Sequence, residues 1–435
     1  MVLDREQLLE RYRETRALSL ELCRPLRPEA WRIQSMPDVS PPWWNLGHTT
    51  WFFAKNVLEP FGGASPEDAR FDYVLNSYYE SLGPRIARTR RGLVTRPTNE
   101  EVLEFRQSVD RRMADLLGKV DGETYERLEL LLFTGIQHEQ QHQELLVTEI
   151  KHILGTDVPE LREPYRSGAS VRPAAPAPEG RFIPFEGGLH DLGNVEGGWC
   201  WDNEMPVHKA WLEPFALLNR LVTNREYLEF IEGGGYRDPL LWLSNGWARA
   251  QAEGWEAPLY WETGEAGWKV WTLSGVRTVD PDEPVCHVSF YEADAFARWK
   301  AQSGGDWADA RLPTEREWEH AARVSGFAGD NFLETGPLHP AVAANEGANT
   351  GADGSLLQVA GDLWEWTSNH YEPYPGYRPF DGNLMEYNGK FMDNQRVLRG
   401  GSCATPGSHI RPSYRNFWPA DARFQFTGIR LARSL

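Results

Sequence analysis

The sequence predicts a multidomain protein with an all-helical N-terminal domain and an α+β C-terminal domain. Apolar residues recur at helical spacing from residue 1 to about 155, with few helix-breaking residues among them. The stretch Ser167–Gly180 is rich in proline and alanine, a composition typical of an extended linker. From Arg181 to Leu435, short β-like runs, glycine-rich turns and tryptophans follow. At 435 residues the chain is long enough for two such domains.

The N-terminal domain, expected over residues 1–165, contains four amphipathic segments. The first begins near Leu8, and the others span Pro42–Leu58, Asn99–Leu117 and Thr124–Leu154. Four helices of this length favour an up-and-down four-helix bundle, whose members bury their apolar faces against one another. The linker is then expected over residues 166–180.

The C-terminal domain, expected over residues 181–435, shows helical patterns at Thr223–Ile231 and Ser289–Ala301. A third helix is expected after Thr314, which forms a capping-box pattern with Glu317. The remainder lacks periodicity, which favours a mixed domain of low regular secondary structure. Tryptophans and glycine pairs stand beside charged residues there, so we expect buried ion pairs and tight turns.

The charge balance narrows the classes of partner. With 45 basic and 63 acidic residues the net charge is −18, which argues against nucleic acid and anionic membrane surfaces. No stretch approaches the roughly 20 apolar residues that span a bilayer, and the first residues lack a signal-peptide pattern. The cysteines are scattered rather than paired as in metal-binding motifs; they are Cys23, Cys200, Cys286 and Cys403. We therefore expect a reduced, cytoplasmic protein.

Two histidines of the last predicted helix form a candidate metal site. His138 and His142 are spaced i, i+4, so both side chains project from one helix face. Two imidazoles so placed can bind one metal ion, and a facing helix of a bundle can supply a third ligand. The best candidate for that ligand is His48, which stands among apolar and aromatic residues. The alternatives are a solvated Gln/Glu-rich face for the pair and a hydrogen-bonded core histidine for His48. The spacing suits zinc as well as iron.

The neighbours of the histidine pair have different expected roles. Glu144 lies about 200° around the helix from His142, so it should face elsewhere and make hydrogen bonds or salt bridges. Gln141 follows His138 by three residues, shares its face and could bind a polar group of a substrate.

A second cluster combines tyrosines with arginines between two predicted helices. Tyr78 and Tyr79 could deliver a proton to a bound oxygen species. Arg85 and Arg88 could clamp a carboxylate bidentately. The alternative is that the arginines pair with surplus surface carboxylates. This is the preferred interpretation for Arg90 and Arg91, whereas for Arg85 and Arg88 the residues alone favour neither interpretation.

Together these motifs resemble the ergothioneine-biosynthetic sulfoxide synthases, a group that includes the related selenoneine synthases. His138, His142 and Glu144 match the His-x-x-x-His-x-Glu motif of a DinB-like four-helix iron domain, and His48 matches its upstream histidine. Three later segments resemble signatures of a formylglycine-generating-enzyme-like (sulfatase-modifying, C-type-lectin-like) domain: Arg311–Glu315, Gly361–Trp366 and Arg399–Ser402. The order of the two domains in one chain makes the resemblance specific.

The resemblance implies a mononuclear non-haem Fe(2+) enzyme whose metal is held by His48, His138 and His142. It implies O2 as oxidant and hercynine (Nα-trimethylhistidine) as acceptor, with sulfur added at C-2 of its imidazole. The donor would be a small thiol, either cysteine or γ-glutamylcysteine. The remaining assignments are catalytic roles for Tyr78 and Tyr79, donor binding by Arg85 and Arg88, and hercynine binding by Gln141, Asn416, Phe417 and Trp418.

Two departures from the family pattern leave the donor open. The usual Trp-His-Leu-Ala-His before the first ligand is here Trp44–His48 with asparagine at position 45, and Ile86 stands where many members carry histidine. One alternative is therefore a selenoneine synthase that forms a C–Se bond between a selenosugar and hercynine. An alternative of another class is a DinB-type metal-binding thiol transferase without O2 chemistry. Formylglycine generation is disfavoured because the C-terminal cysteines are scattered.

Overall fold

The computed structural model describes residues 4–156, 159–166, 176–265, 267–344 and 356–435. The chain forms two compact units, of which the first comprises Met1–Arg166 with Asp381–Glu386 and the second comprises Ser167–Phe380 with Tyr387–Leu435. Of the predicted linker, residues 167–175 lie outside the described residues and 176–180 are irregular. The domain limits at residues 165 and 181 stay a prediction.

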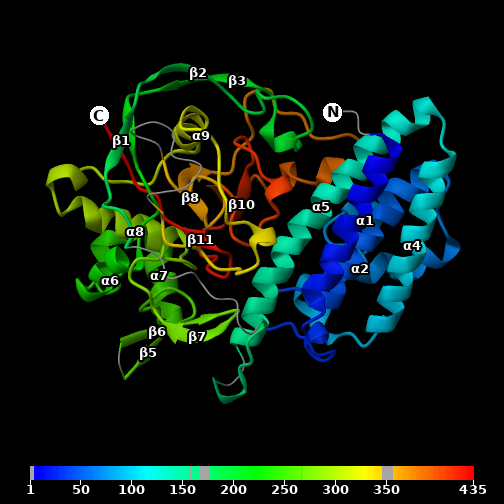
Figure 1. Cartoon of the computed structure of the whole chain (residues 1–435), viewed down its shortest axis with the longest axis horizontal. Coiled ribbons are helices and arrows are strands. Elements are labelled where there is room, and N and C mark those ends of the chain that lie inside the picture. Colours follow the sequence, from blue (N-terminus) through cyan, green and yellow to red (C-terminus); the bar gives the residue numbers. More distant parts are fainter. Residues whose placement is uncertain (1–3, 157–158, 167–175, 266, 345–355) are drawn as a thin grey trace. The chain divides into compact units, whose positions relative to one another are not determined.

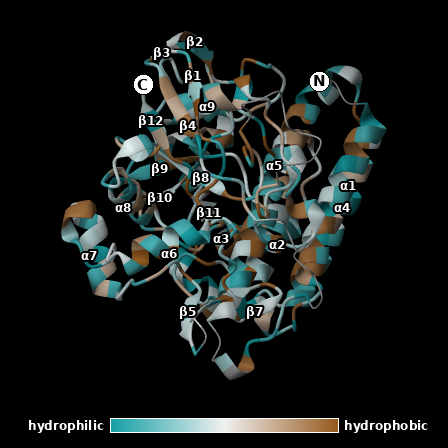
Figure 2. Ribbon diagram, turned by 60° about the vertical axis from the view of Figure 1, so that its left-hand side comes forward, coloured by the Kyte–Doolittle hydropathy of each residue, from teal (hydrophilic) through white to brown (hydrophobic). Residues whose placement is uncertain are grey.

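Unit 1 is built on four long helices, as the sequence predicts (Figure 1). They are α1 (Arg5–Cys23), α2 (Pro42–Phe53), α4 (Asn99–Lys119) and α5 (Gly122–Gly155), with a short α3 (Asp72–Leu75) between. Figure 2 shows hydrophilic and hydrophobic residues alternating along α1 and α4, as expected of amphipathic helices. The predicted second helix ends earlier than expected, because Ala54–Leu58 forms a π-helical turn after Phe53.

The helix starts follow from local sequence. Asp4 and Thr98 form capping boxes at the starts of α1 and α4. Asp121 accepts from the backbone N–H of Thr124 at the start of α5. Pro42 occupies the first turn of α2, where its missing N–H costs nothing.

A buried ionic cluster joins three of these helices. Glu139 of α5 accepts from Arg16 Nη1 of α1 at 2.9 Å, from Ser19 Oγ at 2.6 Å and from Arg106 of α4. Glu139, Arg16 and Arg106 are 0%, 3% and 1% exposed. Because Glu139 follows His138 directly, the cluster fixes which face of α5 carries the histidines.

The described residues of unit 2 form four small sheets and four α-helices. The sheets have the orders β1-β4-β12, β10-β9-β8-β11, β2-β3 and β5-β6-β7. All described pairs are antiparallel except β11 with β8. The strands are β1 (Phe182–Phe185), β2 (Gly188–Leu192), β3 (His208–Leu212), β4 (Phe215–Leu218), β5 (Trp261–Gly264), β6 (Gly267–Thr272), β7 (Gly275–Thr278), β8 (Trp364–His370), β9 (Gln395–Arg399), β10 (Asn416–Pro419), β11 (Thr427–Gly428) and β12 (Ala432–Ser434). The helices are α6 (Asn224–Glu232), α7 (Ser244–Glu253), α8 (Phe290–Ala301) and α9 (Glu315–Val324).

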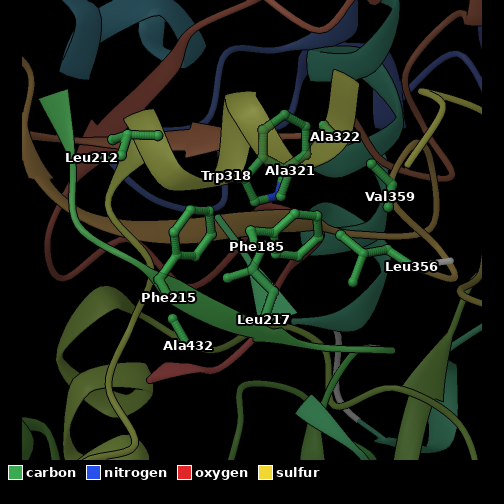
Figure 3. Close-up of a cluster of buried hydrophobic side chains, with 10 residues drawn as sticks. All are labelled: Phe185, Leu212, Phe215, Leu217, Trp318, Ala321, Ala322, Leu356, Val359 and Ala432. Carbon is green, nitrogen blue, oxygen red and sulfur yellow. The ribbon is translucent and has the colours of Figure 1, made fainter. Parts of the chain in front are cut away.

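The three predicted helices of unit 2 are present as α6, α8 and α9, and Thr314 caps α9 with Glu317 as the capping box predicts. The helix α7 has no counterpart in the prediction. Figure 3 shows α9 packed by Trp318 onto the β1-β4-β12 sheet, with Phe185 and Phe215 in the same apolar cluster. The mixed fold with little regular secondary structure is thus confirmed.

Buried ion pairs and tight turns hold this unit, as expected. Arg430 and Glu365 pair at 2.8 Å with both side chains fully buried, and Trp318 Nε1 donates to the same carboxylate at 2.8 Å. Gly400 has a φ of +102°, and a Cβ there would lie 3.0 Å from the Val359 carbonyl oxygen. Throughout the described ranges, no helix combines the length and apolarity needed to cross a membrane.

Candidate metal centre

Three histidines from two helices of unit 1 converge on one point. His48 comes from α2, and His138 and His142 come from α5. One ring nitrogen of each lies within 4.8 Å of the other two, and the ring centroids are 4.6 to 5.1 Å apart. Within the described part of the chain the cluster contains no carboxylate or thiol. Glu144 is buried outside it, as the helix geometry predicts.

The tautomer of His48 suits metal binding. Its Nδ1 lies 2.7 Å from the carbonyl oxygen of Leu75, which can only accept, so Nδ1 carries the proton. The lone pair therefore sits on Nε2, which is buried and has no hydrogen-bond partner among the described residues. A buried acceptor without a donor costs free energy unless a cation occupies the point it faces.

The tautomer of His142 is fixed in a similar way by a side chain. Its Nδ1 lies 2.8 Å from Oδ1 of Asn45, and the amide nitrogen of Asn45 donates to Oε2 of Glu149 at 2.6 Å. The amide oxygen is therefore the group that faces the imidazole. His142 donates from Nδ1 and keeps its lone pair on Nε2.

The surroundings keep all three imidazoles neutral. Burial lowers the pKa of His48 and of His138 well below the usual range, and a neighbouring histidine lowers each further. Burial also lowers the pKa of His142, and the charges of Arg91 and Arg88 add to the effect. Neutral imidazole is the form that binds metals. The donor set thus fits a divalent transition metal.

The two tyrosines lie in a loop that one asparagine holds. After α3, Asn76 Oδ1 accepts from the backbone N–H of Tyr79 at 3.1 Å, and Asn76 Nδ2 donates to the carbonyl of Tyr79 at 2.9 Å. The ring of Tyr79 is buried at 5.9 Å from Trp51, whose ring is 5.8 Å from His48. Tyr78 stacks on Tyr79 at 4.6 Å. Tyr79 therefore packs beside Trp51, a neighbour of His48, and Tyr78 lies on the ring of Tyr79.

The arginines of the adjoining segment differ in their surroundings. Arg85 is partly exposed and pairs with Glu80 at 2.6 Å. Arg88 donates to the carbonyl of Asp38.

Arg91 contradicts the preferred sequence interpretation. It is 3% exposed and, among the described residues, makes no ion pair. Its guanidinium lies 3.4 Å from the ring centroid of Trp44 and donates to Ser40 Oγ at 2.9 Å and Ser77 Oγ at 3.1 Å. Trp44 in turn stacks on His48 at 4.6 Å. The expectation of surface pairing is wrong for Arg91, because the aromatic face replaces a carboxylate as its partner.

The predicted hercynine-binding residues lie in both units. Gln141 is partly exposed on α5, next to His142. Asn416, Phe417 and Trp418 form β10 of unit 2, where Phe417 stacks on Tyr371 at 4.1 Å. Their roles toward a substrate stay predictions.

Sequence reasoning missed one residue that supports the tyrosine loop. Glu386, in the segment Asp381–Glu386 of unit 1, accepts from the backbone N–H of Glu80 at 3.0 Å. It also accepts from the backbone N–H of Ser81 at 2.9 Å and from its hydroxyl at 2.6 Å. No local pattern could reveal this contact, since about 300 residues separate the partners.

Comparison with known proteins adds a family to this geometry. Residues 11–146, which include all three histidines, match the DinB superfamily. Residues 169–355 and 352–435 match the sulfatase-modifying factor enzyme 1-like domain. A hercynine oxygenase of Mycolicibacterium thermoresistibile is 30% identical over 436 residues, covering 92% of this chain and 89% of that protein. The chain belongs to the hercynine oxygenase family.

Two further relatives match part of the chain. The hercynine oxygenase of Mycolicibacterium smegmatis is 34% identical over 324 residues, or 68% of this chain and 70% of that protein. A formylglycine-generating enzyme of Streptomyces coelicolor is 30% identical over 51% of this chain and 77% of its own length. Membership of the hercynine oxygenase family confirms the resemblance inferred from the motifs.

Proposed function

We propose that this protein is an O2-dependent, non-haem iron(II) sulfoxide synthase that joins a small thiol to C-2 of the imidazole of hercynine. The observation that carries the proposal is the cluster of three neutral histidines, in a chain related over 92% of its length to a hercynine oxygenase. In the overall reaction the imidazole C–H and the thiol S–H are lost and a C–S bond forms. One oxygen atom ends on sulfur and the other leaves as water, so the four electrons taken by O2 are accounted for.

His48, His138 and His142 would hold the iron, through Nε2 in the cases of His48 and His142. Bound ferrous iron supplies the redox chemistry that O2 requires. Among the described residues no carboxylate, thiol or further imidazole joins the three histidines, which would leave coordination positions for substrate atoms. Hercynine and the thiol have the imidazole and sulfur that such positions accept.

The other residues would bind the substrates and handle protons. Arg85 and Arg88 form a basic region with the buried Arg91 in a chain of net charge −18, and carboxylates of a donor would be drawn to it. Tyr78 and Tyr79 would supply a proton or electron from their loop beside His48. By the family resemblance, hercynine would be bound by Gln141, Asn416, Phe417 and Trp418, and aromatic faces favour its quaternary ammonium.

The test is product mass after anaerobic reconstitution with Fe(II) and addition of O2. The mixture contains hercynine with cysteine, γ-glutamylcysteine and a 1-seleno-sugar in competition. We expect a hercynine–thiol sulfoxide carrying one labelled oxygen when 18O2 is used. His138→Ala should lose both iron and product, whereas His370→Ala, at an exposed histidine, should keep both. Failure of the wild-type protein to form any adduct of hercynine would refute the proposal.

A second candidate concerns the donor. Asparagine at position 45 and isoleucine at position 86 replace histidines of the usual pattern, and Asn45 contacts His142 directly. These changes favour testing a selenosugar as donor. A selenium isotope pattern in the hercynine adduct would make the protein a selenoneine synthase, with the same metal site and acceptor.

A further inference from the structure

Glu149 and His142 occupy the same face of α5. They are seven positions apart, which is about two helical turns. Asn45 lies opposite them on α2, three residues before the ligand His48, so it shares the face of that histidine. One asparagine of α2 therefore bridges a carboxylate and a ligand histidine of α5.

The hydrogen bonds are donated in one direction, from the histidine cluster toward the carboxylate of Glu149. Glu149 Oε1 accepts from the backbone N–H of Ser40 at 2.8 Å, and Oε2 accepts from Asn45 Nδ2 at 2.6 Å. Asn45 Oδ1 then accepts from His142 Nδ1 at 2.8 Å. The backbone N–H of Ser40 can only donate, and Glu149 can only accept when it is ionised. In that state the amide of Asn45 has one orientation that satisfies all the partners.

The carboxylate of Glu149 is costly where it stands. Glu149 and Asn45 are each 1% exposed, and within the described ranges Glu149 has no ion-pair partner. Burial raises the pKa of Glu149 to about 7, although the bonds from Ser40 and Asn45 and the charges of Arg88 and Arg91 oppose the rise. A buried carboxyl group without a salt bridge is destabilising relative to an apolar residue, which points to a function.

The orientation of His142 depends on side chains. The acceptor for His48 is the backbone carbonyl of Leu75, which is present whatever side chain stands there. The acceptor for His142 is a side-chain amide whose own orientation depends on Glu149. In metal sites, such hydrogen bonds fix the tautomer and ring orientation of a ligand histidine and raise its basicity.

We propose that Glu149 and Asn45 form an outer-sphere pair that positions His142 for metal binding, with Glu149 acting through Asn45. This inference rests on the proposed function only in requiring that the three histidines bind a metal. Both are positioning residues, since neither faces the metal point directly.

The test measures the affinity of the full-length apoprotein for Co(II) and records the ligand-field spectrum of the bound ion. Glu149→Gln is nearly isosteric but would turn a donor toward Ser40 or Asn45, so we expect about 10- to 100-fold weaker binding and a shifted spectrum. Asn45→Ala should lose at least as much, and adding Glu149→Gln to it should cost nothing more. The exposed Glu126→Gln on the same helix is the control and should bind as the wild type does.

Exchanging the two groups gives a second, sharper test. In Asn45→Asp with Glu149→Gln, the new carboxylate can accept from both His142 and the new amide, while the net charge stays the same. In Asn45→Asp alone, two carboxylates face each other, and the affinity for Co(II) should fall. We expect the double variant to recover most of that affinity. Melting curves of all variants separate loss of fold from loss of metal.

The outcomes distinguish this inference from the proposed function. A Glu149→Gln protein with wild-type affinity and spectrum would overturn the inference, and so would failure of the double variant to recover. Weakened Co(II) binding in Glu149→Gln, with no hercynine adduct from the iron-loaded wild type, would support the inference and refute the function. A wild type whose Co(II) binding is unchanged by His138→Ala would overturn both.

Discussion

The buried ionic cluster around Glu139 allows a quantitative prediction of stability, because the structure shows which groups Glu139 contacts. Glu139→Gln keeps the shape of the side chain but removes its charge between Arg16 and Arg106. Arg16 retains Asp110 at 2.8 Å, whereas Glu139 is the one carboxylate that pairs with Arg106 among the described residues. A buried guanidinium left without its counter-ion typically costs about 3–5 kcal/mol. We expect the bundle to lose stability by that amount.

Native-state hydrogen exchange of peptides from α1, α4 and α5 measures this loss without requiring unit 2 to unfold. Since about 1.4 kcal/mol corresponds to a tenfold change, exchange through opening of the bundle should accelerate by at least about 10²-fold. The exposed Glu126→Gln should change the opening free energy by less than about 0.5 kcal/mol. The triple variant Arg16→Met/Glu139→Leu/Arg106→Met should recover most of the loss, because apolar residues can replace a buried ionic cluster. A Glu139→Gln protein within about 1 kcal/mol of the wild type would refute the reasoning.

Three further predictions concern the tyrosine loop and unit 2. Replacing Tyr78 and Tyr79 together with phenylalanine should shift turnover from the sulfoxide toward the sulfinic acid of the thiol. An unchanged product ratio by mass spectrometry would remove both from the mechanism. Glu386→Gln removes the carboxylate that accepts three hydrogen bonds from the loop. Amide hydrogen exchange of residues 78–83 should therefore become about tenfold faster, while the affinity for Co(II) stays constant. Unchanged exchange rates would show that Glu386 does not stabilise the loop. Burial raises the pKa of Asp362 to about 6, above its unfolded value of about 3.9. The stabilising contribution of this carboxyl group to the free energy of unfolding is therefore fully present below about pH 4. It is lost as pH rises through 6, and the loss amounts to up to about 3 kcal/mol. Calorimetry from pH 4 to 7 should show that the stability of Asp362→Asn increases relative to that of the wild type as pH rises. A stability difference that stays constant with pH would argue against this titration.

The sequence was most informative where structure depends on nearby residues. Capping boxes at Thr98 and Thr314 and the helical spacing of His138 and His142 are local patterns, and each corresponds to the structure. The choice of His48 as the third member rested on its apolar and aromatic neighbours in the sequence and on the assumption that bundle helices face one another. The exclusion of Glu144 needed only the helical repeat.

The features that escaped prediction depend on tertiary packing. The burial of Arg91 follows from its stacking on Trp44, and nothing in a run of arginines distinguishes the one that turns inward. Glu149 resembles any glutamate of a helix until α2 brings Asn45 to it across 104 residues of chain. The π-helical turn after α2 likewise has no sequence signal that we identified.

The segment Asp381–Glu386 has a consequence for how the protein is made. Glu386 accepts hydrogen bonds from the backbone N–H and the hydroxyl of Ser81, and it leaves the ribosome 305 residues after that serine. At about 5–20 residues per second, about 15–60 s separate the synthesis of the two. The three histidines of the cluster emerge well before this interval ends, so the helices that carry them can pack while the tyrosine loop still lacks that support. Translation order thus delays full assembly of the loop until Glu386 has been synthesised.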